Sequence, residues 1–208
     1  MKNNYESKYF EFISNGLEET LYEIENKSVL KEVFFNELVN LTSITKKLKG
    51  RLFFIGNGAS AAFSNHMALD WSKNGGLYAT SLSDSALLTA LSNDYSYEQA
   101  FVEFLKIEGV NEKDLIVTIS SSGNSKNITN VLEYCNLAKI KTIGFSGLNN
   151  DNKTRLLADF SLYVPKKTYG IVECIHQVFL HLWLDKSMGI YEWEREDVQN
   201  MNSKEFKL

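Results

Sequence analysis

The sequence predicts an α/β fold, a doubly wound parallel sheet of five strands preceded by a pair of N-terminal helices. Along residues 50–208, short apolar runs that are typical of buried strands alternate with longer segments whose apolar residues recur at helical spacing. Polar turns rich in glycine, serine and asparagine directly follow the first and third of these runs. Ligands of such sheets bind beyond the strand C-termini, so these turns are candidate sites.

The segment at residues 5–49 predicts two helices, because its apolar residues recur at helical spacing in both halves. These residues are Tyr9, Phe10, Phe12, Ile13, Leu17, Leu21 and Ile24, followed by Leu30, Val33, Phe34, Leu38, Leu41 and Ile44. Both helices look apolar on more than one face, which packing on their own domain or against another subunit explains equally well. We expect a single domain over residues 1–208. Residues 1–49 supply helices for oligomer packing, and residues 50–208 form the α/β core with the C-terminal helix.

The remaining elements follow in order from the same patterns. Strands are predicted at residues 51–55, 77–82, 115–119, 142–146 and 160–164. Helices are predicted from the turn at 56–60 to about residue 73, over about 84–91 and 97–105, after residue 125, and over about 170–187. Two glycines after Asn74 are typical of a helix stop.

Composition narrows the class of protein. The chain has 208 residues, enough for one sizeable core, and its net charge of -4 argues against nucleic acid as a partner. Its two cysteines, Cys135 and Cys174, are typical of a reducing compartment rather than a disulfide framework. No apolar run approaches the roughly 20 residues of a membrane span, and the N-terminus has no leader pattern. We therefore expect a cytoplasmic protein with neither nucleic acid nor membrane as a partner.

The most informative segment is residues 120–125, Ser-Ser-Ser-Gly-Asn-Ser, named here the serine loop. It follows the apolar run at 115–119 and precedes a helical pattern with Ile128, Val131 and Leu132. Hydroxyl donors, a glycine for close backbone approach and helix N-terminal amides together favour an anion such as phosphate. A single serine there would be an ordinary helix cap, but four serines in six residues favour the anion site.

A second loop at residues 56–60, named here the first loop, also follows a strand and opens a helix. It is not a dinucleotide fingerprint, because residue 61 is alanine, and it has no Gly-Lys-Ser/Thr of a P-loop. Loops of this kind suit a small phosphorylated ligand. Asn57 and Ser60 would then contact its hydroxyls while the serine loop holds its phosphate.

Candidate acid and base groups fall in two places. His66 and Asp70 are four residues apart and share one helix face, which suits proton transfer or metal binding but is also common in exposed hydrogen-bonded pairs. Glu173 precedes His176 and His181 on the last helix, and spacing alone does not decide which histidine shares its face. His181 lies in an apolar stretch, where a histidine is more often a core residue than a catalyst. The polar pair Asn93 and Asp94 fits a turn or cap, or a contact to a sugar hydroxyl.

Four segments together resemble the SIS (sugar isomerase) domain family, and within it the phosphoheptose isomerases: residues 56–62, 88–95, 119–125 and 141–147. The resemblance extends over nearly the whole chain. It implies a flavodoxin-like fold and a homotetramer with sites at subunit interfaces. It also implies an enzyme that converts sedoheptulose 7-phosphate to D-glycero-D-manno-heptose 7-phosphate, at the start of heptose synthesis for lipopolysaccharide or capsule.

The resemblance further implies the roles of individual residues. Asp70 and His181 fall on the catalytic positions. Some family members hold zinc, so it allows one zinc ion per site, at His66, Asp70, Glu173 and His181, and no nucleotide cofactor. The substrate contacts it implies are Asn57, Gly58, Ser60, Asn93, Asp94, Ser120, Ser121, Ser122, Ser125 and Glu173.

The sequence departs from the family pattern where protons are transferred. Asp70 stands in place of a glutamate and Glu173 in place of a glutamine, and two carboxylates suit a divalent cation better than one. Asn74 and Gly170 replace an arginine and an aspartate on the substrate side, which leaves the exact phosphosugar open. We expect Asp70 to act as the base of an enediol mechanism and His181 as the opposite acid and base, with Glu173 and His66 orienting them or completing a metal site.

Two alternatives remain. The first is an isomerase for another phosphosugar, which gene neighbours would identify. The second is a non-catalytic SIS protein that binds sugar phosphates or a replication initiator. Such a protein should keep the serine loop but lose its acid and base residues, whereas here carboxylates and a histidine persist at every proton-transfer position. The sequence therefore favours an enzyme.

Overall fold

The computed structural model describes residues 4–194, so residues 1–3 and 195–208 of the predicted single domain lie outside that range. All five predicted strands form, and they pair in parallel in the order β4-β3-β5-β6-β7. This confirms the predicted doubly wound parallel sheet. The strands are β3 (Leu52–Gly56), β4 (Ala79–Ser81), β5 (Leu115–Ser120), β6 (Lys141–Gly147) and β7 (Phe160–Val164).

The predicted strand count is wrong, because the described part of the chain forms a mixed sheet of seven strands rather than five. β1 (Leu21–Ile24) and β2 (Lys27–Ser28) form a hairpin, and β1 pairs antiparallel with β7. The sequence pattern extends the first helix through these residues. The turn residues Glu25 and Asn26 instead have φ values of 49° and 60°, the left-handed conformation that tight hairpin turns require.

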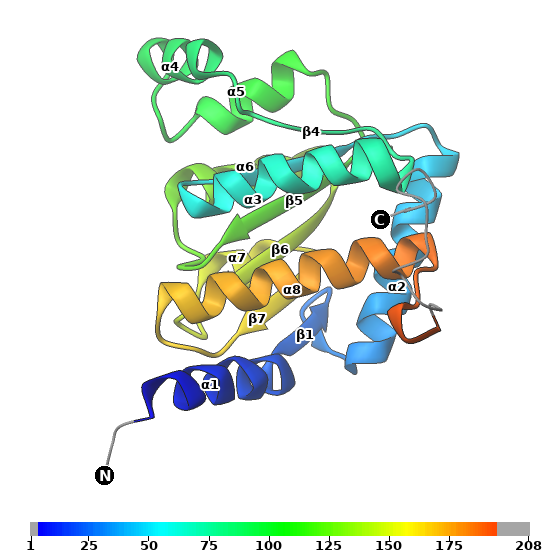
Figure 1. Cartoon of the computed structure of the whole chain (residues 1–208). Coiled ribbons are helices and arrows are strands. Elements are labelled where there is room, and N and C mark those ends of the chain that lie inside the picture. Colours follow the sequence, from blue (N-terminus) through cyan, green and yellow to red (C-terminus); the bar gives the residue numbers. More distant parts are fainter. Residues whose placement is uncertain (1–3, 195–208) are drawn as a thin grey trace.

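Helices cover both faces of the sheet (Figure 1). Leu52 and Phe54 of β3 pack with α2, α3 and α8, whereas the alternate residues Phe53 and Ile55 pack with α5 and α6 on the other face. α1 packs against α8. Among residues 4–194, no helix has the length and apolar character needed to cross a membrane. The helices are α1 (Tyr5–Glu19), α2 (Lys31–Lys47), α3 (Ala59–Asp70), the π-helix η1 (Trp71–Gly75), α4 (Ser85–Asp94), α5 (Ala100–Ile107), α6 (Lys126–Ala138), α7 (Lys153–Leu157), α8 (Tyr169–Met188) and the 3-10 turn η2 (Glu192–Glu194).

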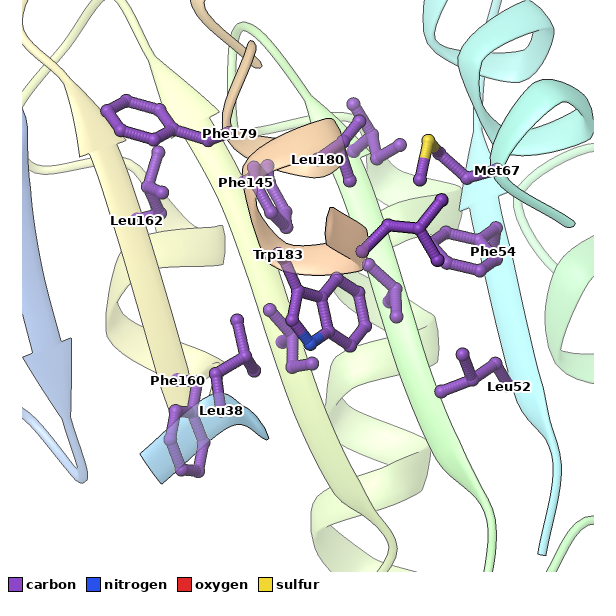
Figure 2. Packing of buried hydrophobic residues seen from close by; sticks show 14 of the residues in the cluster. Leu38, Leu52, Phe54, Met67, Phe145, Phe160, Leu162, Phe179, Leu180 and Trp183 are labelled. Carbon is purple, nitrogen blue, oxygen red and sulfur yellow. The ribbon is translucent and has the colours of Figure 1, made fainter. Parts of the chain in front are cut away.

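The core under α8 fixes that helix on the sheet (Figure 2). Trp183 is fully buried, and its ring packs against the rings of Phe54 and Trp71. The Trp183 indole N–H donates to the Thr42 hydroxyl of α2 at 3.0 Å, so the one polar group of this large side chain is satisfied. This packing holds α8 close to α3, beside which it lies in Figure 1.

The strand order creates a crevice at one point of the sheet. β3 and β5 are neighbours, but the helices that follow them, α3 and α6, lie on opposite faces. The two loops after these strands therefore diverge, which opens a space at the carboxyl edge of the sheet. Such switch points are where open α/β sheets bind ligands. Here the diverging loops are the first loop and the serine loop.

Candidate functional site

The first loop and the serine loop meet at the switch point and line a cavity of about 110 Å³. We call it the serine cavity. Ser60 lies in the first turn of α3, Ser125 is the N-cap of α6 and Tyr169 is the first residue of α8, so the N-terminal ends of three helices border it. Such ends favour negative charge. The lining residues are Asn57, Ser60, Ile119, Ser120, Ser121, Ser122, Ser125, Tyr169 and Glu173.

Two of the serines that line this cavity have hydroxyl groups that form no hydrogen bond expected of their position. The Ser121 hydroxyl is buried and has no hydrogen-bond partner among the described residues. Ser125 caps α6 by position, but its side chain makes no cap hydrogen bond. A buried polar group without a partner costs stability, so a ligand that bonded the Ser121 hydroxyl would remove that cost. Gly123 allows the loop to lie this close to its neighbours, since a Cβ there would meet the Asn152 side-chain oxygen at 2.1 Å and its φ is +65°.

A second group of polar side chains joins α3 to α8. The His66 Nε2 lies 3.2 Å from the Asp70 Oδ2, and the His66 and His181 rings are 5.2 Å apart. The three residues offer ligand atoms that all lie within 4.8 Å of one another. We call them the proton-transfer group. Two imidazole nitrogens and one carboxylate oxygen are a donor set that fits a divalent cation such as zinc.

The end of α3 positions Asp70 in this group. Asp70 is the last residue of α3, and a π-helical turn, Trp71–Gly75, begins immediately after it. Such turns are rare and occur frequently at functional sites. Asp70 is only 8% exposed, so its carboxylate is held against the protein and needs the His66 partner.

Glu173 lies apart from the proton-transfer group. It lines the serine cavity and also the groove along α8 that His181 lines. Eight residues, or about 12 Å of helix rise, separate Glu173 from His181. Among the four predicted metal ligands, the structure therefore brings three together and directs the fourth toward the serine cavity.

The structure decides between the two histidines of the last helix. His176 is fully buried under β6, where its Nε2 donates to the Ser146 carbonyl at 3.0 Å. Burial lowers the pKa of His176 to about 4, so it is neutral at pH 7. His176 is a core residue, and His181 is the histidine that reaches the polar group on α3.

Gln177 is a site residue that the sequence interpretation missed. Its side-chain Nε2 lies 2.8 Å from the His181 Nε2, and its Oε1 is buried without a partner in the described structure. This hydrogen bond fixes the orientation of the His181 ring, and its donor depends on the histidine tautomer. The signal was present, because residues four apart on a helix are neighbours. Tyr169, at the rim of the serine cavity, was also missed.

Two predicted substrate contacts are not among the residues that line the serine cavity. Asn93 and Asp94 form the exposed end of α4 and hydrogen-bond to each other at 2.9 Å. Neither lines the serine cavity. α4 packs mainly against α5 at the upper edge of the molecule in Figure 1.

An open apolar groove of about 980 Å³ runs along α8 and adjoins the proton-transfer group through His181. We call it the α8 groove. Tyr9 of α1 and Phe63 of α3 form parts of its walls. Leu182 and Trp193 also line it, and they are 36% and 80% exposed. An apolar surface of this size marks an interaction site more often than a solvent-facing surface.

Comparison with known proteins identifies relatives over most of the chain. The SIS domain family model matches residues 35–147. A phosphoheptose isomerase of Helicobacter pylori (strain Shi470) is 33% identical over 153 residues, which cover 71% of this chain and 79% of the relative. One from Aneurinibacillus thermoaerophilus is 35% identical over 138 residues, covering 64% and 69%.

Solved structures share the fold. The phosphoheptose isomerase of Neisseria gonorrhoeae superposes with a TM-score of 0.75 at 24% identity, over 88% of this chain and 95% of that one. A structure from Bacteroides fragilis, described as a putative phosphosugar isomerase involved in capsule formation, gives a TM-score of 0.65 at 16% identity, over 94% and 97%.

Proposed function

The chain belongs to the SIS domain family, among the phosphoheptose isomerases, and we propose that it converts sedoheptulose 7-phosphate to D-glycero-D-manno-heptose 7-phosphate. One observation carries the proposal. A cavity built for an anion and a group of acid and base side chains lie on the same pair of helices, and Glu173 lines both the serine cavity and the α8 groove that His181 enters. A sugar phosphate needs both features, one for its phosphate and one for the carbons at its other end.

The phosphate would bind in the serine cavity. Ser120, Ser121, Ser122 and Ser125 supply hydroxyl donors, and the N-termini of α3 and α6 supply a favourable field. No arginine lines this cavity, so hydroxyls and backbone amides carry the anion. The unpaired Ser121 hydroxyl would gain an acceptor on binding, which removes the cost of leaving it unbonded.

The proton transfers would fall on the side chains of α3 and α8. An aldose–ketose isomerase moves a proton between C1 and C2 through an enediol, and it moves another between the two oxygens. Asp70 acts as the base at carbon, because its carboxylate is buried and bonded to His66. His181 exchanges the proton at oxygen from the opposite side, oriented by its hydrogen bond to Gln177.

A zinc ion fits the donor atoms that are present. His66, Asp70 and His181 would hold it, and the fourth residue that the resemblance implies, Glu173, lies outside this cluster. When bound, zinc would polarise the substrate carbonyl as a Lewis acid. His66 and Glu173 would otherwise orient the two proton carriers.

We also propose a homotetramer, in which a second copy covers the α8 groove. The two N-terminal helices differ in this respect. Phe34 and Leu38 of α2 are fully buried in their own domain, whereas Phe10 and Phe12 of α1 are 68% and 55% exposed beside the groove-lining Tyr9. Of the two explanations for the apolar faces in residues 1–49, packing on their own domain therefore applies to α2. Packing against another subunit applies to α1.

We expect the enzyme to act in the cytoplasm. Cys135 and Cys174 are both free thiols, which suits a reducing compartment. Cell fractionation would test this, and recovery from the cell exterior would contradict it.

The function is tested by incubating the purified protein with sedoheptulose 7-phosphate in heavy water. We expect the aldose product to form with deuterium at C2, since the enediol exchanges its proton with solvent. A panel of five-, six- and seven-carbon ketose phosphates separates the alternatives. Turnover of another member alone would indicate a different phosphosugar isomerase. Binding without turnover or exchange on any member would indicate a non-catalytic sugar-phosphate receptor.

A further inference from the structure

Two residues outside the lining of the serine cavity bond the same cavity residue, Asn57. The Asn57 Nδ2 donates to the Asn127 Oδ1 at 2.9 Å, and the Asn127 Nδ2 donates back to the Asn57 Oδ1 at 3.0 Å. The Tyr97 hydroxyl donates to that same Asn57 Oδ1 at 2.6 Å. Asn57 belongs to the first loop, Asn127 to the first turn of α6, and Tyr97 to the segment between α4 and α5. Three separate parts of the chain thus converge on one side chain.

The hydrogen-bonding capacity of Asn57 is nearly exhausted by these contacts. Its side-chain oxygen has two lone pairs, and the Asn127 amide and the Tyr97 hydroxyl occupy both. Its nitrogen has two N–H groups, and Asn127 accepts one of them. A single N–H is left over. Since Asn57 lines the serine cavity, that N–H is the one polar contact its side chain can offer a ligand there.

The surroundings keep this arrangement rigid. Asn127 is only 3% exposed, so its amide depends on Asn57 for satisfaction. The backbone is also confined at Gly56, where the first loop begins, because a Cβ there would meet the Ser60 carbonyl oxygen at 2.6 Å. Tyr97 is half exposed, so burial does not exclude water from its hydroxyl. The position of Tyr97 in the fold instead directs the hydroxyl to Asn57.

We propose that Asn127 and Tyr97 are positioning residues that fix Asn57 as a donor of one N–H to an acceptor oxygen of a bound sugar phosphate. This rests on the proposed function, in which the serine cavity holds the phosphate end of the substrate. The acceptor is a phosphoryl or sugar oxygen, and a ligand group that only donates hydrogen bonds is disfavoured at this position. Neither positioning residue touches the ligand. Each acts by keeping the Asn57 amide from rotating.

The test is a double-mutant cycle on the full chain, with sedoheptulose 7-phosphate binding measured by calorimetry. Tyr97→Phe removes one neutral hydrogen bond and should weaken binding about two- to tenfold. In an Asn57→Ala background, the same substitution should change nothing, because Tyr97 acts only through Asn57. Tyr95→Phe is the matched control, since Tyr95 is an exposed tyrosine of the same segment without a bond to Asn57, and it should leave affinity unchanged in both backgrounds.

Asn57→Asp tests the donor role and provides a second background where Asn57→Ala fails to fold. The carboxylate keeps the shape of the amide but has no N–H, so affinity should fall at least as far as in Asn57→Ala. Equal effects of Tyr97→Phe in all backgrounds, or retained affinity in Asn57→Asp, would overturn the inference while leaving the proposed function standing. Absence of binding by the unaltered protein would overturn both.

Discussion

The serine cavity and the proton-transfer group are built in different ways. Backbone loops at the ends of β3 and β5 form the cavity, and the N-termini of α3 and α6 border it. The proton-transfer group instead consists of side chains from two helices, His66 and Asp70 of α3 and His181 of α8, next to the open α8 groove. The first is a consequence of the sheet topology. The second depends on how two helices pack and on what covers them.

This difference indicates how the serine cavity and the proton-transfer group should respond to substitutions. In the proposed function, phosphate binding uses many small contacts from one chain, so no single residue carries it. Proton transfer uses one or two groups whose protonation and placement decide the rate. Substitutions in the cavity should therefore act on binding, and those in the proton-transfer group on the rate constant.

The largest effect is expected at the proton carriers. Asp70→Asn and His181→Gln should each lower kcat by about 10²–10⁴-fold, because a proton carrier acts in the transition state. Affinity for sedoheptulose 7-phosphate, measured by calorimetry, should stay nearly unchanged. Asp151→Asn, an exposed change of the same chemistry between β6 and α7, is the control and should keep full activity. Intact turnover in both variants would place the catalytic pair elsewhere.

Local sequence patterns were enough to predict the parallel sheet and the serine loop. Strands, hydroxyl-rich turns and helix starts are each decided by neighbouring residues. The β1–β2 hairpin was missed because its stabilising contacts are distant. Glu23 pairs with Arg155 at 2.7 Å, and Tyr22 packs against the rings of Phe34 and Phe179. These partners override a helical pattern that continues from α1, and no local rule reveals them.

The candidate site shows the same contrast between features that neighbouring residues decide and features that distant contacts decide. Helix spacing left the roles of His176 and His181 open, and only the family resemblance predicted that His181 would join His66 and Asp70. Burial under β6 assigns His176 to the core. The bond from Tyr97 to Asn57 joins residues 40 apart in sequence, so it was visible only in the fold.

A second prediction tests whether turnover needs a second subunit over the α8 groove, whereas binding in the serine cavity needs only one chain. Leu182→Glu puts a charge into the α8 groove and should dissociate the tetramer, as measured by light scattering at micromolar concentration. Turnover should fall with assembly, whereas sugar-phosphate binding in the serine cavity should persist. Leu137→Glu, at an exposed leucine of α6 outside the groove, should leave assembly and turnover intact. A monomeric unaltered protein would contradict the proposed assembly.

A third prediction concerns the two histidines of α8. Burial lowers the pKa of His176 from 6.5 to about 4, so between these pH values the unfolded chain binds a proton that the folded chain does not. The titration of His176 therefore leaves the free energy of unfolding unchanged above pH 6.5 and lowers it as the pH falls toward 4. The loss is about 3 kcal/mol, at 1.36 kcal/mol per pKa unit.

His176→Gln keeps a donor for the Ser146 carbonyl but removes this titration. The difference in unfolding free energy between the two proteins, measured by urea denaturation from pH 7 to 4, should shift in favour of the variant by that amount. Parallel pH profiles would show that His176 is not the buried neutral group described here.

The smallest effect on kcat is expected in the serine cavity, at Ser121. Its hydroxyl is buried and unpaired in the free protein, so Ser121→Ala should not destabilise the fold and should raise the thermal midpoint slightly. The same change removes a hydrogen bond to a charged phosphate, worth roughly 1.5–3 kcal/mol, and should raise KM about ten- to hundredfold with little change in kcat.

Ser146→Ala is a matched control, because the Ser146 hydroxyl is also buried and unpaired but does not line the cavity. It should share the effect on stability and leave KM unchanged. Equal KM values for both variants would show that Ser121 does not belong to the phosphate site. If Ser121→Ala changed the stability but not the binding, its hydroxyl would be an ordinary packing defect of the loop.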